Sequence, residues 1–139
     1  MIKIVFLLLV TLSSVFAGGI KWEKDYATAL KQSKALNKPM MFIISNHNCH
    51  FCVQFESTAL SNPKVIQKLN TEFVAAIVYV DNNPVFPNDL YVGGTPATWF
   101  LKSDGEPLFE PLMGAVDTAG FLKALDIVSG EYKKTATKK

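Results

Sequence analysis

Residues 40–52 read MMFIISNHNCHFC, and this stretch decides the fold. Its first five residues are an unbroken apolar run, too short for a helix and typical of a strand that is covered on both faces. A polar break over residues 45–48 follows, and the only two cysteines of the chain, Cys49 and Cys52, then stand at the start of a helix expected over residues 49–60. The stretch therefore predicts a buried strand that leads through a short loop into a helix with a Cys-x-x-Cys pair.

The rest of the chain alternates between helix and strand patterns. Upstream, Trp22, Tyr26 and Leu30 lie four residues apart among lysines, which predicts an amphipathic helix that ends at residues 37–39. Downstream, the further expected elements are a short helix with Asn62 as cap and Pro63 as first residue, a buried strand over 73–80, a loop over 81–94 with a helical turn at 88–91, a strand over 97–101, an edge strand at Leu108-Phe109, and a helix that begins at Asp117 and stops at Gly130. We therefore predict a single α/β domain.

Composition and charge limit the classes of function. The chain has 139 residues, of which 49% are hydrophobic and 19% charged, and this excludes a disordered protein. All 14 basic residues are lysines, and four of them fall in residues 133–139. We predict a Lys-rich flexible tail there, whereas the expected domain, residues 18–132, carries more acidic than basic side chains. This argues against nucleic acid as a partner, and the lack of arginine rules out bidentate readout of phosphate.

The amino-terminal residues have the three parts of a secretory signal. Lys3 gives a basic start, residues 4–12 form an apolar centre, and Val15 and Ala17 are the small residues expected before a cleavage site. We predict a signal peptide over residues 1–17 and export to a bacterial periplasm, where a cysteine pair meets oxidising conditions. An uncleaved membrane anchor is the alternative, although the apolar run is shorter than the roughly 20 residues that a spanning helix needs.

The position of the cysteine pair predicts its chemistry. Residues three apart in a helix share one face, with Cα atoms roughly 5 Å apart, which a disulfide tolerates. At a helix start, the free N–H groups and the positive end of the dipole favour the thiolate of Cys49, and a protonated His50 would add to this effect. We expect Cys49 to be the attacking nucleophile and Cys52, one turn further in, to be the resolving thiol.

Other roles fit the pair less well. A structural disulfide over so short a loop contributes only about 2 kcal/mol. A metal site would use His47, Cys49, His50 and Cys52, but ligands this crowded do not easily surround a tetrahedral ion and also start a helix. Haem attachment needs a histidine directly after the second cysteine, where this chain has Val53. We therefore expect no metal and no cofactor, with a copper or zinc site and an inert disulfide as the alternatives.

Further motifs surround the pair: Trp22, Ala29-Leu30, Lys38-Pro39, Cys49-His50-Phe51-Cys52, Phe73-Val74, Val80-Asp81, Tyr91-Val92-Gly93-Gly94-Thr95-Pro96, Gly105 and Gly114. With these motifs, which cover nearly all of the mature chain, the sequence resembles the thioredoxin-fold superfamily, and within it the exported thioredoxin-like group. The resemblance implies a mixed four- to five-stranded sheet with helices on both faces. It also implies that Pro96 is cis and packs beside the cysteines, and that the backbone of Thr95 pairs with a substrate strand.

The sequence departs from ordinary thioredoxin in two ways. The buried acid and lysine that move protons there would fall near Ile43 and Ile77, so that pair is missing, and deprotonation of Cys52 must use water or another group. Glu56, one turn along the helix, could face the site, but we expect a solvated side chain. The second departure is His50-Phe51 between the cysteines; strongly oxidising periplasmic enzymes also have a histidine there, although at the other of the two intervening positions.

These observations predict a periplasmic thiol–disulfide oxidoreductase that reduces disulfides of exported proteins. A threonine before the proline, here Thr95, is similar to the periplasmic reductases and isomerases, whereas a histidine between the cysteines, here His50, indicates oxidation. An oxidising enzyme is therefore the alternative to a reducing one. A non-enzymatic metal-binding module and a chaperone-like domain are further alternatives. The expected partners are proteins with disulfides or dithiols and a membrane electron donor. The dimeric isomerases of this superfamily carry an added dimerisation domain. This chain has no room for such a domain, so we expect a monomer.

Overall fold

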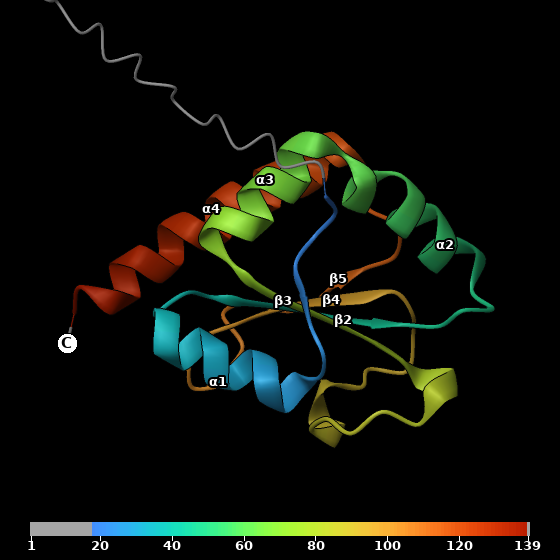
Figure 1. Cartoon of the computed structure of the whole chain (residues 1–139), viewed down its shortest axis with the longest axis horizontal. Coiled ribbons are helices and arrows are strands. Elements are labelled where there is room, and N and C mark those ends of the chain that lie inside the picture. The colour runs from blue at the N-terminus through green and yellow to red at the C-terminus, as the bar shows by residue number, and fades with distance from the viewer. Residues whose placement is uncertain (1–17, 139) are drawn as a thin grey trace, which may run out of the picture.

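A mixed β-sheet forms the centre of the molecule. The computed structural model describes residues 18–138, so the predicted signal peptide (residues 1–17) and Lys139 lie outside the described residues. Within residues 18–138 the sheet has five strands in the order β1-β3-β2-β4-β5 (Figure 1). The strands are β1 (Trp22–Glu23), β2 (Met40–Ser45), β3 (Val74–Tyr79), β4 (Ala97–Leu101) and β5 (Leu112–Met113). β1 and β2 run parallel to β3, whereas β4 runs antiparallel to β2 and β5 antiparallel to β4, which confirms the expected mixed sheet.

Helices cover both faces of this sheet. Over residues 18–138 the α-helices are α1 (Tyr26–Leu36), α2 (His50–Ser57), α3 (Pro63–Glu72) and α4 (Thr118–Ala136), and the short 3-10 helices are η1 (Ala59–Ser61), η2 (Val80–Asn82) and η3 (Asn88–Leu90). Figure 1 shows α1 on one face and the other three α-helices on the opposite face. β2 is buried along its whole length, because it lies in the middle of the sheet between two apolar layers. This confirms the prediction of a strand that is covered on both faces.

Successive side chains of β2 enter two separate cores. Met41 and Ile43 pack in the cluster that α2, α3 and α4 cover, where the ring centroids of Phe55 and Phe121 are 5.1 Å apart. Phe42 faces α1, and its ring meets Tyr26 edge-on at 5.0 Å. The alternation follows from the two-residue period of a strand.

Several expected elements are confirmed at their boundaries. The Asn62 side chain caps α3 by accepting a hydrogen bond from the Lys64 N–H (3.0 Å), and Pro63 begins that helix. β4 spans the predicted residues 97–101, and the expected helical turn near residue 88 is η3. In each case a local signal, a cap or an apolar run, defines the element.

The first predicted helix is wrong at its beginning. Trp22 does not belong to α1 but to β1, where it pairs with Ala75 of β3. The Asp25 side chain caps α1 by accepting a hydrogen bond from the Thr28 N–H (2.7 Å), so the helix begins only after it. The spacing of four between Trp22 and Tyr26 is therefore a coincidence of two different elements.

The cysteine-bearing helix is shorter than predicted. α2 ends at Ser57 instead of continuing to residue 60, and η1 follows it. The hydroxyls of Ser57 and Thr58 both donate hydrogen bonds to the Gln54 carbonyl oxygen. Such side chains compete with the helical backbone bonds, which explains the break.

The carboxyl-terminal elements also differ from the prediction. The edge strand is β5, not Leu108-Phe109, although the Leu108 N–H still bonds the Phe100 carbonyl oxygen (2.9 Å). α4 continues past Gly130 to residue 136, so residues 133–136 of the predicted flexible tail are helical. The contact of Tyr132 with Asn37 (2.9 Å) holds this last part of α4 against the domain. Tertiary packing thus outweighs the cost of about 1 kcal/mol that an internal glycine adds.

Among the described residues, no helix has both the length and the apolar character that crossing a membrane needs.

Candidate active site

Strand directions bring the cysteines and the Thr-Pro pair together. β2 ends beside the end of β3, where Ser45 pairs with Tyr79, and beside the start of the antiparallel β4, where Ile44 pairs with Ala97. The loop after β2 and the loop before β4 therefore meet at one end of the sheet. Cys49 lies in the first of these loops and Thr95-Pro96 in the second.

The structure joins these residues by direct contact. The Cys49 thiol donates a hydrogen bond to the Thr95 carbonyl oxygen, with 3.5 Å between sulfur and oxygen. The Thr95–Pro96 peptide bond is cis, as the resemblance implies. Just before it, Gly93 has a φ of 80°, in the left-handed region that favours glycine. The predicted site residues Cys49, Cys52, Thr95 and Pro96 thus lie at one end of the sheet.

Cys49 is the cap of α2. Its backbone is extended (φ −96°, ψ 117°), and its sulfur accepts a hydrogen bond from the Cys52 N–H at 3.2 Å. The sulfur takes the place that a hydroxyl or carboxylate oxygen takes at an ordinary helix cap, and a thiolate accepts such a bond better than a thiol. The helix start therefore stabilises negative charge on Cys49.

Hydrogen bonds lower the pKa of Cys49. Desolvation by burial raises it, but bonds from the Cys52 thiol, the Thr95 side chain and backbone N–H groups outweigh this, and the pKa lies below its ordinary value. His50, which we expected to contribute, is not among the causes of this shift. The first cysteine therefore has enhanced thiolate character without a neighbouring cation.

Cys52 has the opposite environment. Its side chain is fully buried, and desolvation together with the hydrogen bond to Cys49 raises its pKa above the ordinary value, although bonds from Thr95, Ser45 and the Asn46 backbone act the other way. A buried thiol with a raised pKa stays protonated at neutral pH and loses its proton only when it reacts. The two sulfurs thus differ in both access and charge.

The residues between the cysteines face solvent. Phe51 is 59% exposed, and the His50 ring lies edge-on to it at 5.5 Å. Both lie on the first turn of α2, next to the accessible sulfur. Both side chains are therefore exposed at the surface beside the Cys49 sulfur.

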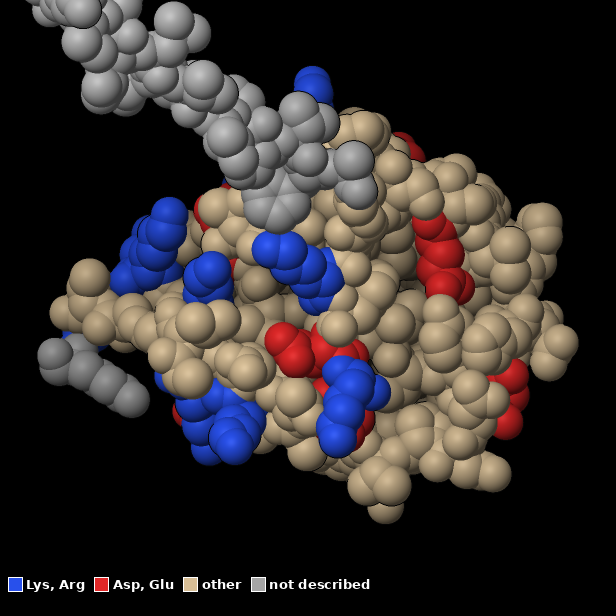
Figure 2. All heavy atoms as spheres, in the orientation of Figure 1, with Lys and Arg blue, Asp and Glu red and all other residues tan. Residues whose placement is uncertain are grey.

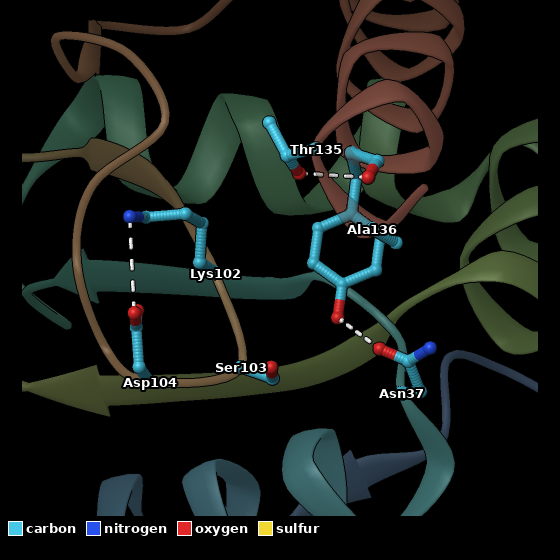
Figure 3. A pocket seen from close by; sticks show the side chains of 7 residues that line it. Asn37, Lys102, Ser103, Asp104, Thr135 and Ala136 are labelled. Atoms are coloured by element: carbon cyan, nitrogen blue, oxygen red, sulfur yellow. Dashed lines mark hydrogen bonds and ion pairs between the residues drawn. The ribbon is translucent and has the colours of Figure 1, made fainter. Parts of the chain in front are cut away.

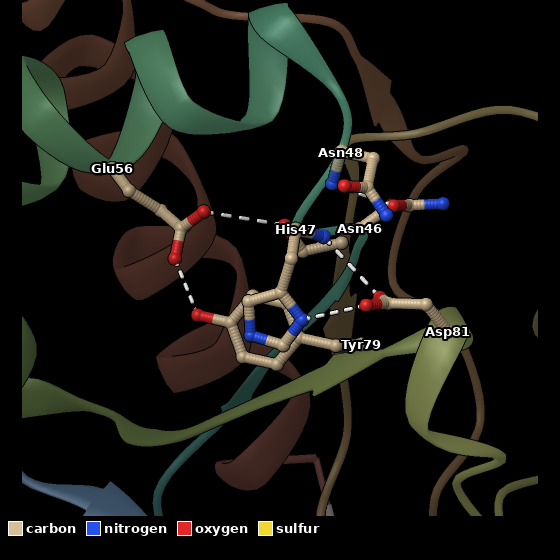
Figure 4. A network of polar contacts seen from close by, with 7 residues as sticks. Asn46, His47, Asn48, Glu56, Tyr79 and Asp81 are labelled. Carbon is tan, nitrogen blue, oxygen red and sulfur yellow. Dashed lines mark hydrogen bonds and ion pairs between the residues drawn. The ribbon is translucent and has the colours of Figure 1, made fainter.

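A polar network behind the cysteines was missed by the sequence prediction (Figure 4). We expected a solvated Glu56, but this side chain is half-buried and accepts hydrogen bonds from the hydroxyls of Tyr79 and Ser45. The bond from Tyr79 and the burial of that ring raise the pKa of Tyr79, with desolvation as the larger cause. The only signal in the sequence is the spacing of four between Cys52 and Glu56, which places both on one side of α2.

His47 belongs to the same network. Its ring stacks on Tyr79 with 3.8 Å between centroids, and its Nδ1 lies 2.8 Å from an Asp81 carboxylate oxygen. That contact lowers the pKa of Asp81. Over residues 18–138, no three His, Cys, Asp or Glu side chains come together in a way that could hold a metal ion, so the ligand set of the metal alternative does not assemble.

The pocket drawn in Figure 3 lies elsewhere. It has a volume of about 310 Å³ and is lined by Asn37 and Tyr132 on one side and by residues 102–104 on the other. Asn37 precedes β2 and Lys102 follows β4, so this hollow is at the end of the sheet opposite the cysteines. Its polar groups bond one another, as Tyr132 does with Asn37 (2.9 Å) and Lys102 with Asp104 (3.8 Å). We assign it no catalytic role.

Basic and acidic side chains are also distributed unequally between these two ends of the sheet. In the view of Figure 2, lysines gather toward the end that carries the last turns of α4, and the end that carries α2 shows acidic side chains and no lysine. Residues 39–63 and 69–101, which supply the cysteine and Thr-Pro loops, contain no lysine or arginine. Hydrogen bonds, and not a fixed positive charge, must therefore stabilise the Cys49 thiolate.

Comparison with known proteins agrees with this geometry. Residues 26–129 match the family model of the thioredoxin-like domain. A solved thioredoxin from Thermus thermophilus is 31% identical, with 80% of this chain and 88% of that chain covered and a TM-score of 0.67. The carboxyl-terminal domain of DsbD from Neisseria meningitidis, in its oxidised form, is 23% identical over 74% of this chain and 96% of that chain, with a TM-score of 0.55. A structure described as DsbH oxidoreductase is 18% identical over 82% and 87% of the two chains, with a TM-score of 0.66.

A curated relative is much longer than this chain. An uncharacterized Caenorhabditis elegans protein is 27% identical in an alignment of 128 residues, which covers 83% of this chain but 17% of that protein. This chain therefore corresponds to one part of that relative.

The unlike environments of the two cysteines predict selective alkylation. In the dithiol form at neutral pH, iodoacetamide should modify Cys49 and spare Cys52, because only the first sulfur is accessible and has a lowered pKa. Peptide mass mapping after limited alkylation measures the site. The rate should titrate at a lower pH than that of a cysteine in a short unstructured peptide. Equal modification of both sulfurs in the folded protein would contradict the assignment, and equal modification after denaturation is the control.

Proposed function

Because this chain belongs to the thioredoxin-like domain family, we propose that it is a thiol–disulfide oxidoreductase whose redox pair is Cys49 and Cys52. The supporting observation is the unlike placement of the two sulfurs. Cys49 is a partly accessible helix cap with a lowered pKa, and Cys52, one turn away, is buried with a raised pKa. An attacking and a resolving thiol need these two environments.

The reaction in the reducing direction has two steps. The Cys49 thiolate attacks one sulfur of a substrate disulfide, and the other substrate sulfur leaves as a thiolate and takes up a proton. Cys52 then attacks the sulfur of Cys49 in the mixed disulfide, so the substrate is released with both sulfurs reduced and the Cys49–Cys52 disulfide forms. A donor of two electrons restores the dithiol.

The substrate would dock as an extended segment beside the cysteines. The Thr95 carbonyl oxygen lies next to the Cys49 sulfur, so a segment that pairs with this backbone would bring its own sulfur into line with Cys49. Phe51, on the first turn of α2, offers exposed apolar area beside it. We assign Thr95, Pro96, His50 and Phe51 to substrate positioning.

We also propose that the protein acts after export to the periplasm. The proposal rests on the three-part pattern of residues 1–17. In that compartment an enzyme that reduces disulfides must receive its electrons from across the membrane, and a membrane protein with a dithiol is the partner we propose.

Reduction is the direction we favour. The 31% identical structure is described as a thioredoxin, and thioredoxin is a reductant with a potential near −270 mV. Oxidation is the second candidate, because hydrogen bonds that stabilise the Cys49 thiolate also stabilise the reduced form of the pair. The two candidates differ in the redox potential of one disulfide.

Single serine variants should separate the two steps. Cys49→Ser should abolish reduction of insulin disulfides, because no other thiol is accessible to attack. Cys52→Ser should trap mixed disulfides between Cys49 and substrate proteins, which non-reducing electrophoresis would reveal as species that disappear with dithiothreitol. Full activity of the Cys49 variant would end the proposal.

The redox potential should decide the direction. Equilibration of the Cys49–Cys52 couple with glutathione buffers, followed by mass measurement of alkylated species, gives the potential. A value near −270 mV is expected for a reductant, whereas a value near −120 mV, that of the strong oxidant DsbA, would establish oxidation instead.

Export is tested by the mass of the mature chain. Expression of the full sequence in a Gram-negative host should give a periplasmic protein that begins at Gly18. A membrane-bound product that keeps residues 1–17 would show an anchor in place of a cleaved signal, and a cytoplasmic product of full mass would contradict export.

A further inference from the structure

A second pocket adjoins the one drawn in Figure 3, and the two share Asn37, Tyr132 and Ala136 in their walls. It is lined by residues 37–39, which lead into β2, by the end of α3 and by the last turns of α4. Its volume is about 550 Å³, within the range of roughly 300–1,000 Å³ that is typical of small-molecule sites. We call it the α4 pocket.

The wall of the α4 pocket is mostly apolar. Tyr132 is almost fully buried, and its hydroxyl donates a hydrogen bond to the Asn37 side chain (2.9 Å). Ser129 is also almost fully buried, and its hydroxyl donates a hydrogen bond to Glu72 (2.8 Å). Because these polar groups already bond one another, the pocket offers an entering molecule apolar surface and few hydrogen-bonding partners.

The charged groups of the wall are two lysines and one glutamate. Burial acts to raise the pKa of Glu72, but hydrogen bonds from Lys68 (2.7 Å) and Ser129, together with the charges of Lys68 and Lys133, hold it below its ordinary value. Lys38 and Lys133 line the pocket, and among residues 18–138 neither forms an ion pair with a carboxylate. The wall therefore holds two ammonium groups against one carboxylate, and that carboxylate has another partner.

Other lysines belong to the same end of the molecule. Lys34 is in the last turn of α1, and Lys134 follows Lys133 in the last turn of α4. Figure 2 shows lysines gathered toward this end, whereas the cysteine and Thr-Pro loops at the other end contain none. A negatively charged molecule is therefore attracted to the end of the domain that carries the α4 pocket.

We propose that the α4 pocket binds an anionic amphiphile, namely a free fatty acid, which combines an apolar chain with one negatively charged head. The chain buries its methylene groups against Tyr132 and the other apolar groups of the wall. The head pairs with Lys38 and Lys133, whose flexible stems keep their ammonium groups in water at the rim. Both parts of such a ligand thus meet a surface of matching character.

The length of β2 separates this pocket from the cysteines. The strand has six residues, which span roughly 20 Å, and Lys38 lies before its beginning whereas Cys49 lies after its end. A ligand in the α4 pocket therefore leaves the Cys49 sulfur uncovered. Binding of the amphiphile and thiol–disulfide exchange are independent properties, which separate experiments can measure.

Calorimetric titration tests both parts of the ligand. Dodecanoate, added below the concentration at which it forms micelles, should bind with one molecule per chain. The Kd should fall about fourfold for each methylene added between decanoate and tetradecanoate, because each buried methylene contributes a similar free energy. Dodecyltrimethylammonium, which has the same chain and a positive head, should bind about tenfold more weakly. Equal binding of the two, or no binding of dodecanoate, would overturn the proposal.

Lysine variants test the pairing with the head. A protein with both Lys38→Gln and Lys133→Gln should bind dodecanoate about tenfold more weakly, since each exposed ion pair contributes about threefold. Lys123→Gln makes the same change at an exposed lysine near the start of α4 and should bind as tightly as the parent protein. Insulin reduction and thermal unfolding should be unchanged in all of these variants. An unchanged affinity in the double variant would refute the pairing that we propose.

Amide resonances should locate the ligand and exclude other sources of binding. On addition of dodecanoate, NMR shifts should concentrate in residues 37–38, 71–72 and 129–137 and be absent from residues 46–52. Shifts concentrated in residues 46–52 instead would show that the exposed Phe51 surface takes the ligand, against the proposal. Sedimentation of the protein with phosphatidylglycerol vesicles, without binding of free dodecanoate, would show a membrane surface as the partner and also overturn it. Loss of insulin reduction in the parent protein would contradict the proposed function alone.

Discussion

The position of β2 is the constraint on which the rest of the structure depends. This strand is buried on both faces, lies parallel to β3 and antiparallel to β4, and brings its own end, the end of β3 and the start of β4 to one place. The loops that carry Cys49 and Thr95-Pro96 meet there for that reason alone. The same arrangement places the polar ends of two strands, Ser45 and Tyr79, side by side beneath α2, where a buried polar group must find a partner.

Two identical side chains acquire different chemistry from their positions on one helix. Cys49 precedes the helix and takes the free N–H groups of its first turn, whereas Cys52 lies inside the helix and faces the core. The end of the molecule that holds them has no lysine in its loops, so the difference arises from hydrogen bonding and burial, which salt screens far less than it screens charges at the surface.

The parts of the site that could be predicted are those with local signals. An apolar run, a cap residue and a Cys-x-x-Cys spacing identify β2, α3 and the cysteine pair, because each depends on neighbours in the chain. Trp22 and Glu56 were predicted wrongly for one common reason. Trp22 pairs with the edge of β3, and Glu56 accepts hydrogen bonds from hydroxyls on β2 and β3. These partners are distant in the sequence, so no local pattern of residues indicates them.

The sequence by itself determined the kind of domain and its reactive pair. Hydrophobic periodicity requires an α/β sheet, and the place of the cysteines at a helix start follows from the order of elements, since both are properties of adjacent residues. Only the tertiary structure decided which sulfur is accessible, which is buried, and which groups surround them. Those properties depend on contacts such as Cys49 with Thr95 and Ser45 with Glu56, which form only when separate strands and helices pack against one another.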